Sequence, residues 1–330
     1  MRDGAPPLVS VVIPFYSRGS LVQATVESVW AQRYTPLELI AMDDASTDNT
    51  LALLEDLQRR SPIPMRVGRH EKNQGMTKTL NDGVALSSGQ FVAFLDCDDT
   101  YLPGRFEAQV CRLRAEPDLM VVYGNGRQLL ADGTIGERVH SGEIADLLSK
   151  SPAEILQRLY TRLTPVFLQT VLMRREFFDE IGGFDEAALS NDWPLNIRVF
   201  RRLSNGGRHA YLDQDFFLYR LHDRNMHKDY AVMSRLILQV FERYTPVDLQ
   251  RPAFANAYWT VGGMALGAGR YGTGIVYLTR SQWYRPRPLR FLRVLLGLLI
   301  TAVLPAPVVT RLKARWRSLK VGSGSTETAA

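Results

Sequence analysis

Three aspartates stand at the end of a short apolar segment, in an arrangement suited to binding a metal ion. The run from Phe91 to Leu95 is typical of a buried strand, and Asp96, Asp98 and Asp99 follow it directly. Carboxylates this close repel one another, and a hard divalent cation such as Mg²⁺ or Mn²⁺ relieves the repulsion. Helix capping explains one aspartate but not three. The pattern therefore favours a metal site at the end of a strand, where open α/β sheets bind ligands.

A second acidic turn follows another apolar segment. Asp43 and Asp44 come directly after the run from Leu37 to Met42. At this place in a βαβ unit, a carboxylate accepts hydrogen bonds from a nucleobase or a ribose. Ser46 or Asp48 is enough to cap the following helix, so the sequence favours a ligand-binding role for Asp43 and Asp44.

The elements that position these acids alternate between short apolar runs and amphipathic helical patterns. This alternation predicts an α/β fold, a mostly parallel sheet with helices on both faces. Strands are expected at residues 9–14, 37–42, 65–67, 91–95 and 119–123. Helices are expected at residues 20–32, from 48 or 50 to 57, at 77–86 and at about 103–115.

The C-terminal quarter of the chain differs from the rest in its charge. Between Leu249 and Thr326 there are twelve Lys and Arg residues and no Asp or Glu, and the apolar run Val294–Val309 lies among them. Its sixteen residues, interrupted by two prolines, fall short of the roughly 20 that a spanning helix needs. We expect a helical segment on an anionic membrane surface. The alternative is packing against the protein itself or against a second subunit in an oligomer.

Length and composition indicate how the chain is divided. Its 330 residues, 45% of them hydrophobic, suffice for one α/β domain and an extension. We expect a catalytic domain at 1–228, a helical, basic and apolar extension at 229–320, and a disordered tail at 321–330. Two cysteines without a C-x-x-C pair, and no apolar signal region, favour a cytoplasmic protein on the inner face of the membrane. No aromatic-rich RNA-binding sheet pattern accompanies the basic residues, so no nucleic-acid partner is expected.

Six segments in this order resemble the family 2 glycosyltransferases, which have the GT-A fold. The resemblance covers roughly residues 8–228. The segments are Val9–Tyr16, Asp43–Asp48, Asn73–Gly83, Phe94–Asp99, Gly182–Trp193 and Tyr219–His222.

The resemblance implies a role for each segment and an inverting, metal-dependent sugar transfer. It implies a nucleoside-diphosphate sugar as donor, with a UDP-sugar expected, and a saccharide or lipid-linked acceptor, in surface polysaccharide synthesis. The metal is implied to be Mn²⁺ or Mg²⁺, held by Asp98 and His222, although a lone histidine is also often structural. The general base is implied to be Asp192, for which a helix cap is the alternative. The residues implied to bind the nucleotide sugar are Pro14, Phe15, Tyr16, Asp43, Asp44, Asn73 and Asp96.

Two residues depart from the family pattern. Ser17 replaces the usual Asn of the first loop, and Asn191 replaces the usual Glu before the base. The Gln-x-x-Arg-Trp motif of processive synthases is absent, since Leu312–Trp316 lacks the Gln. A transferase that adds one sugar at a time is therefore expected.

Other classes fit parts of the sequence less well. The stretch Phe94–Thr100 also fits a haloacid-dehalogenase-type phosphatase with Asp96 as the nucleophile. That family usually opens with the motif and later needs a paired-Asp turn, but no Asp-Asp pair follows Asp99. The glycine pattern of Gly267–Gly272 spells a dinucleotide fingerprint without a preceding strand, so it indicates helix packing instead. A non-enzymatic scaffold would leave the clustered carboxylates without a role.

Overall fold

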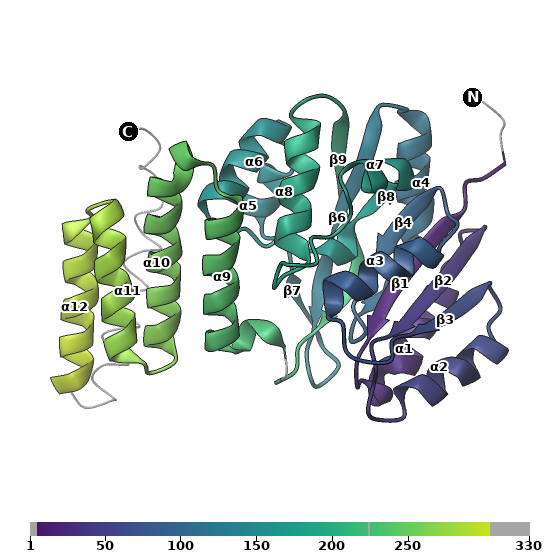
Figure 1. Ribbon diagram of the computed structural model, residues 1–330, viewed down its shortest axis with the longest axis horizontal. Coiled ribbons are helices and arrows are strands. Elements are labelled where there is room, and N and C mark those ends of the chain that lie inside the picture. The colour runs from purple at the N-terminus through teal and green to yellow at the C-terminus, as the bar shows by residue number, and fades with distance from the viewer. Residues whose placement is uncertain (1–4, 224, 304–330) are drawn as a thin grey trace.

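A single sheet forms the centre of the computed structural model, which describes residues 5–223 and 225–303 (Figure 1). Its hydrogen-bonded order within the described chain is β3-β2-β1-β4-β8-β6-β9-β5, with β7 paired to β6 off this path. The strands are β1 Val9–Phe15, β2 Leu37–Asp43, β3 Met65–Arg69, β4 Phe91–Phe94, β5 Thr100–Tyr101, β6 Leu119–Leu129, β7 Ile135–Arg138, β8 Leu172–Arg174 and β9 Arg208–Arg220.

The first half of the sheet is parallel, as the alternating pattern predicts. β1 pairs in parallel with β2 and β4, and β2 pairs in parallel with β3. Every residue of β1, β2 and β4 is buried, because helices cover both faces and the strands read as continuous apolar runs. The register aligns Phe15 with Asp43 and Asp43 with Arg69, so these strands end at one edge.

The second half of the sheet is mixed, which the sequence does not reveal. β8 runs antiparallel to both β4 and β6, and β5 runs antiparallel to β9. β8 has three residues and β5 has two, too few for a period-2 pattern to be read. β6 and β9 pair in parallel with several register shifts.

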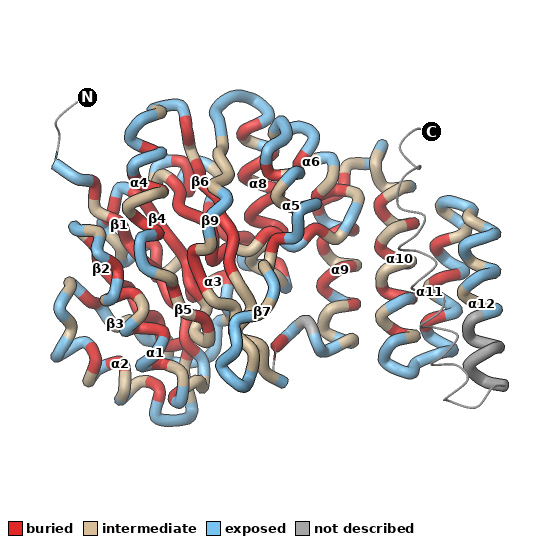
Figure 2. Tube along the Cα trace, turned by 180° about the vertical axis from the view of Figure 1, so that it is seen from behind, coloured by how far each residue is buried: buried red, intermediate tan, exposed pale blue. Residues whose placement is uncertain are grey.

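The helices cover the sheet from both sides, and Figure 2 shows the buried strands between them. α1, α2 and α4 share one apolar core with β1, and α3, α6, α8 and α9 share the other. The four predicted helices are confirmed as α1 to α4. The longer helices are α1 Gly19–Trp30, α2 Thr50–Arg59, α3 Met76–Leu86, α4 Arg105–Ala115, α6 Pro152–Thr161, α8 Asp192–Leu203, α9 Tyr230–Tyr244, α10 Gln250–Gly267, α11 Tyr271–Tyr284 and α12 Pro288–Val303. The short ones are α5 Gly142–Leu147, α7 Arg175–Glu180 and the 3₁₀ turns Leu168–Thr170, Met226–Lys228 and Val247–Leu249.

Helix α3 lies close to the sheet and binds a loop from a distant part of the chain. A Cβ atom on Gly83 would lie 2.4 Å from Cγ1 of Val12, so only glycine permits this approach. Asn81 exchanges two hydrogen bonds with the backbone of Phe184, at 3.0 Å and 2.9 Å. The Asn73–Gly83 segment therefore anchors the Gly182–Glu186 segment through Asn81.

The C-terminal helices begin inside the main core and then extend away from the sheet (Figure 1). Phe241 of α9 packs edge-on against Trp193 of α8, with ring centroids 5.0 Å apart. Arg243 pairs with the buried Asp185 at 2.9 Å. Helix α9, which follows residue 228, shares its apolar core with α8. The division of the chain into two domains at residue 228 therefore stays a prediction.

Beyond α9, helices α10, α11 and α12 form an array at one end of the molecule (Figure 1). The Gly267–Gly272 segment forms the turn between α10 and α11. Its interpretation as helix packing is wrong, because a Cβ atom on Gly267, Gly269 or Gly272 would meet nothing within 4 Å, and the two helices approach closely at Gly262 and Gly274 instead. Within the residues that the structure describes, no helix is both long enough and apolar enough to cross a bilayer. The second part of the Val294–Val309 run and the 321–330 tail lie outside those residues.

Candidate active site

The three aspartates after β4 form a compact carboxylate cluster. One oxygen of each residue, Asp96, Asp98 and Asp99, lies within 4.8 Å of those of the other two. Burial raises the pKa of Asp96 and of Asp99 well above the usual value, and neighbouring carboxylates raise both further. Such a set of hard oxygen donors, held close against their mutual repulsion, fits a divalent cation.

His222 lies beside the cluster because β5 pairs with β9. The turn that carries the acids runs directly into β5, whose Thr100 pairs with Leu218 near the end of β9. The Nε2 atom of His222 lies 3.0 Å from Oδ2 of Asp98. Two neighbouring ligand atoms of an octahedral ion with bonds of about 2.1 Å lie about 3.0 Å apart. The distance therefore suits a shared cation as well as a direct hydrogen bond.

Asp99 has a different position from its two neighbours. Its Oδ1 accepts the backbone N–H of Arg220 at 2.9 Å, and its Oδ2 accepts Nε2 of Gln169 at 3.2 Å. The side chain is 1% exposed. With both oxygens engaged, Asp99 supports the cluster, while Asp96 and Asp98 are the carboxylates suited to a metal or a donor.

Asp192 lies near the same cluster, on helix α8, which packs in the core shared with α3, α6 and α9. It is the first residue of α8, and the cap is Asn191, whose side-chain oxygen accepts the Asp192 N–H at 2.9 Å. The helix-cap alternative for Asp192 is therefore wrong, and the Asn that departs from the family pattern has that role. The charge of the Asp192 carboxylate raises the pKa of Asp96, and the backbone N–H of Leu168 lowers the pKa of Asp192, so Asp96 and the Leu168 N–H both lie near this carboxylate.

The environment of Asp192 suits a proton acceptor. Burial raises the pKa of Asp192 to about 7. Its Oδ1 is buried and has no hydrogen-bond partner among the described residues. A buried carboxylate oxygen without a partner is costly, so it is ready to accept a proton from a bound hydroxyl group.

The three residues expected in the first loop differ in their exposure. Pro14 and Phe15 are buried in β1, and Phe15 packs in the core below α1 and α2. Tyr16 is 48% exposed at the end of that strand. Asn73, in the loop before α3, is exposed. The side chains of Tyr16 and Asn73 are thus accessible at this edge, whereas those of Pro14 and Phe15 are not.

Asp43 and Asp44 are both buried at the end of β2. Asp44 accepts the backbone N–H groups of Gln74 at 2.7 Å and Gly75 at 2.9 Å, and its Oδ1 lies 2.7 Å from Nδ1 of His70. It therefore shapes the loop that carries Asn73. Asp43 receives the Ser46 N–H at 3.3 Å on Oδ2, while its buried Oδ1 has no partner among the described residues. That oxygen is the better acceptor for a nucleotide.

A pocket that contains two arginines lies next to the carboxylate cluster. Arg18, at the start of α1, has its Nε 3.9 Å from Oδ2 of Asp98. The Nε of Arg220 donates to the Asp98 carbonyl oxygen at 3.1 Å. Both arginines and His222 line the pocket, together with Ser17 and two aspartates, Asp48 and Asp223. The guanidinium groups are donors suited to phosphate oxygens.

Sequence reasoning missed Arg18 and Gln169. Nothing in the sequence marks Arg18. Gln169 is a lone amide in the apolar stretch 166–173, and a polar residue there is a signal that a buried group needs its hydrogen bonds.

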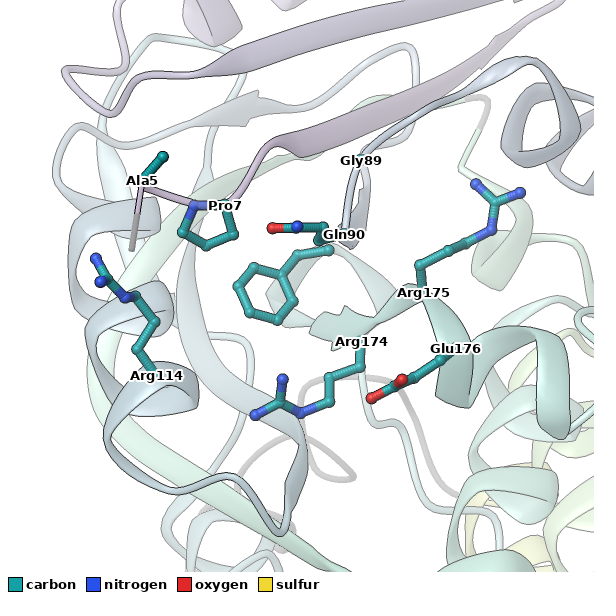
Figure 3. Close-up of a pocket in the computed structure, with 9 residues that line it drawn as sticks. Ala5, Pro7, Gly89, Gln90, Arg114, Arg174, Arg175 and Glu176 are labelled. Atoms are coloured by element: carbon teal, nitrogen blue, oxygen red, sulfur yellow. The ribbon is translucent and has the colours of Figure 1, made fainter. Parts of the chain in front are cut away.

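Another pocket lies at the opposite edge of the sheet (Figure 3). It is lined by Gln90 and Phe91, at the start of β4, and by three arginines. Arg174 donates to the carbonyls of Leu113 and Leu119, and Arg175 pairs with Asp179. The lining residues include one acid, Glu176, and no cluster of carboxylates, so the acids after β4 remain the candidate active site.

Comparison with known proteins gives a consistent result. The family described as Glycosyl transferase family 2 matches residues 10–182. An uncharacterized glycosyltransferase of Nostoc is 33% identical over 241 residues, which are 68% of this chain and 67% of that protein. An uncharacterized glycosyltransferase of Haemophilus influenzae is 27% identical over 223 residues, 66% of each chain. The GalNAc(5)-diNAcBac-PP-undecaprenol beta-1,3-glucosyltransferase of Campylobacter jejuni is 24% identical over 216 residues, 65% of each chain. The chain thus spans about two thirds of these relatives' length.

Solved structures confirm the predicted GT-A-type fold. The mannosyltransferase PcManGT of Pyrobaculum calidifontis, in complex with GDP-Man and Mn²⁺, has a TM-score of 0.57 at 16% identity, over 97% of this chain and 83% of that one. S. aureus TarS 1-349, in complex with UDP-GlcNAc, has a TM-score of 0.55 at 17% identity, over 84% and 91%. The phosphatase alternative is not favoured, because its motif lies inside the family match.

Proposed function

Because the chain belongs to glycosyl transferase family 2, we propose that it transfers a sugar from a nucleoside-diphosphate sugar to a hydroxyl group of an acceptor. The carrying observation is that the Asp192 carboxylate of α8 lies close enough to Asp96, in the cluster after β4, for its charge to raise the pKa of Asp96, although the two residues come from distant parts of the chain. The aspartate cluster suits a diphosphate with a cation, and Asp192 suits an acceptor hydroxyl.

On the donor side, Asp98 and His222 are the residues that would hold Mn²⁺ or Mg²⁺. The cation would neutralise charge that develops on the leaving diphosphate. Arg18 and Arg220 add positive charge beside it. Asp96 is placed to contact the ribose or a water in the same site. Tyr16, Asn73 and the buried Asp43 oxygen are the candidate contacts to the nucleoside, and a UDP-sugar is the proposed donor.

On the acceptor side, Asp192 takes the proton of the attacking hydroxyl as the bond to the anomeric carbon forms. Direct displacement by that oxygen inverts the anomeric centre, and the diphosphate leaves on the opposite face. Burial of Asp192 brings its pKa to about 7, near the value at which a general base works best in neutral solution.

The proposed acceptor is a saccharide, either free or linked to a lipid, in the synthesis of a surface polysaccharide. The Campylobacter jejuni relative carries the name of a glucosyltransferase with an undecaprenol-diphosphate-linked saccharide as its acceptor. A lipid-linked acceptor lies at a membrane surface, so the C-terminal helices become relevant to the reaction.

The exposed face of α11 and α12 supports peripheral attachment to the inner face of an anionic membrane. Trp283, Leu289 and Leu292 are 84%, 73% and 52% exposed. Exposed arginines, among them Arg285 and Arg293, lie between these apolar side chains. Apolar side chains that enter the interface, together with basic residues that reach headgroups, are the usual means of such binding. Self-association through the same helices is the alternative.

A screen of nucleoside-diphosphate sugars tests the proposal. The protein is incubated with each sugar, with a panel of acceptors and with Mn²⁺ or Mg²⁺, and both released nucleoside diphosphate and thermal stability are measured. We expect one donor to give metal-dependent stabilisation and nucleoside-diphosphate release, because ligand binding to the native state raises apparent stability. Release of phosphate from simple phosphomonoesters, without any response to nucleotide sugars, would refute the transferase assignment.

A further inference from the structure

One short segment contacts both halves of the site through consecutive residues. Residues 166–171, here called the strap, lead from α6 into β8. Gln169 donates from Nε2 to Oδ2 of Asp96 at 2.6 Å and to Oδ2 of Asp99 at 3.2 Å. The backbone N–H of the preceding residue, Leu168, lies near the Asp192 carboxylate and lowers its pKa. The donor-side acids and the proposed base therefore lie next to neighbouring residues of the strap.

The other side of the strap is fixed by two fully buried side chains of α4. Arg105 donates from Nη1 to the Gln169 carbonyl oxygen and from Nη2 to that of Val171 at 2.6 Å. Gln109 donates from Nε2 to the Thr170 carbonyl oxygen at 2.8 Å and accepts Nε of Arg105 at 2.9 Å. Three consecutive carbonyls thus have side-chain donors.

The charge of Arg105 makes this arrangement costly. The residue is 0% exposed, and among the described residues no ion pair involves it. Its guanidinium group lies over the Tyr101 ring at 4.0 Å and donates hydrogen bonds to the strap and to Gln109. Burying a charge without a carboxylate partner is expensive, and here hydrogen bonds to the buried carbonyl oxygens of the strap offset part of that cost. The five fixed donors of a guanidinium group do hold two carbonyls at a set spacing.

The beginning of the strap, Val166 and Phe167, is also held by side chains. The Phe167 N–H donates to Nε2 of His140 at 3.0 Å, and burial lowers the pKa of His140 to about 4, which keeps that nitrogen an acceptor. Asn196 of α8 donates to the Val166 carbonyl oxygen at 3.1 Å and to that of Asp192 at 2.8 Å. The strap is thereby tied to the first turn of the helix that carries the base.

We propose that Gln169 is a positioning residue of the transfer reaction: it orients Asp96 toward the donor, and through Asp99 it holds the turn that presents Asp98 to the cation. The strap sets the spacing between these acids and Asp192. Partners of this kind, one step removed from a metal ion, orient its ligands, and their loss typically lowers metal affinity or activity about 10–100-fold. The inference rests on the proposed metal-dependent transfer.

The test compares two buried glutamines. Gln169→Met keeps the side-chain volume and removes both donated hydrogen bonds. Gln32→Met is the matched control, because Gln32 is also buried and donates to two carbonyls, Ser28 and Leu102, away from the acids. Mn²⁺ affinity is measured on the full-length proteins without nucleotide, by calorimetry or by the spin-resonance signal of free Mn²⁺. We expect Mn²⁺ binding about 10–100-fold weaker in Gln169→Met and unchanged in Gln32→Met.

Steady-state kinetics at saturating Mn²⁺ give the second readout. Gln169→Met is expected to lower kcat with a small change in the acceptor KM. Gln169→Asn, which keeps the amide on a shorter side chain, is expected to recover part of the Mn²⁺ affinity, and it replaces the Met variant if that variant does not fold.

Two results would overturn the inference. In the first, Gln169→Met binds Mn²⁺ as tightly as the wild type and loses only as much thermal stability as Gln32→Met. The wild type then still binds Mn²⁺, so the proposed function survives. In the second, the wild type itself binds no Mn²⁺, and the metal-dependent function fails together with the inference.

Discussion

The Nε2 atom of His222 lies 3.0 Å from Oδ2 of Asp98, although 124 residues separate the two in the chain. The two-residue strand β5 makes this contact possible, since it continues the acidic turn and pairs with β9 just before His222. Strand pairing therefore brings the His222 imidazole to the carboxylate cluster.

Substitution of Asp98 tests the metal site. Asp98→Asn removes one charge from the pair with His222, and we expect a rate at least about 100-fold lower, comparable to the loss of one strong electrostatic stabiliser. An excess of chelator should abolish transfer by the wild type. Asp56→Asn, in an exposed ion pair on α2, serves as the control and should keep wild-type activity. Undiminished transfer by Asp98→Asn in chelator would exclude the metal role.

The pH dependence of turnover tests the state of Asp192. Its carboxyl must be ionised to act as a base, and burial raises its pKa to about 7. The rate should therefore rise with pH up to about 7 and then level off. A rate that is constant from pH 5 to pH 8 would contradict this assignment.

The raised pKa of Asp192 also predicts how the stability of the protein changes with pH. Because the folded state binds the Asp192 proton more tightly than the unfolded state, whose pKa is near 3.8, this group's contribution to stability falls as pH rises from about 4 to about 7. Urea unfolding across this range should show that decline in the wild type. The decline should be smaller in Asp192→Asn, which has no proton to lose.

Kinetics of Asp192→Asn separate the acceptor side from the donor side. We expect turnover to fall strongly while affinity for the nucleotide sugar stays nearly unchanged, because the base acts on the acceptor in the transition state. Donor affinity is measured by calorimetry. A variant that loses donor affinity but keeps its turnover at saturation would place Asp192 in the donor site instead.

Vesicle binding tests the C-terminal helices. Leu289→Ser combined with Leu292→Ser should weaken binding to anionic vesicles by about tenfold or more, since each buried leucine contributes about 1.5–3 kcal/mol. Val247→Ser is the control, because Val247 is 84% exposed but lies before α10. High salt should detach the protein only in part, because apolar insertion is not screened. A full-length protein that ignores anionic vesicles at low salt would leave self-association as the role of these helices.

Arg105 allows a stability prediction. Arg105→Met leaves the buried carbonyls of Gln169 and Val171 without donors, and each such group costs about 1–3 kcal/mol. We expect the free energy of unfolding to fall by about 2–4 kcal/mol in urea titrations. Arg112→Met on the same helix removes an exposed pair with Glu116 and should cost less than about 1 kcal/mol. Equal losses in the two variants would argue against a demand for Arg105 by the strap.

The sequence alone determined the parallel half of the sheet and the acids at its edge. Apolar runs such as Val9–Phe15 and Phe91–Phe94 report burial on both faces directly, and parallel strands bring their carboxyl ends to one edge. Asp43 and Asp96 could therefore be assigned to the same site before any tertiary contact was known.

Only the tertiary structure decided how the rest of the site is assembled. β5 and β8 have no local pattern, because their pairing depends on strands about 50 residues or more away, as with Val122 and Leu172 or Thr100 and Leu218. Gln169 and Arg105 meet because buried carbonyls and carboxylates require donors, and such requirements arise only once the chain has folded. Only the structure shows that the cap of α8 is Asn191, one residue before the alternative position at Asp192, so the side chain of Asp192 is not engaged in capping.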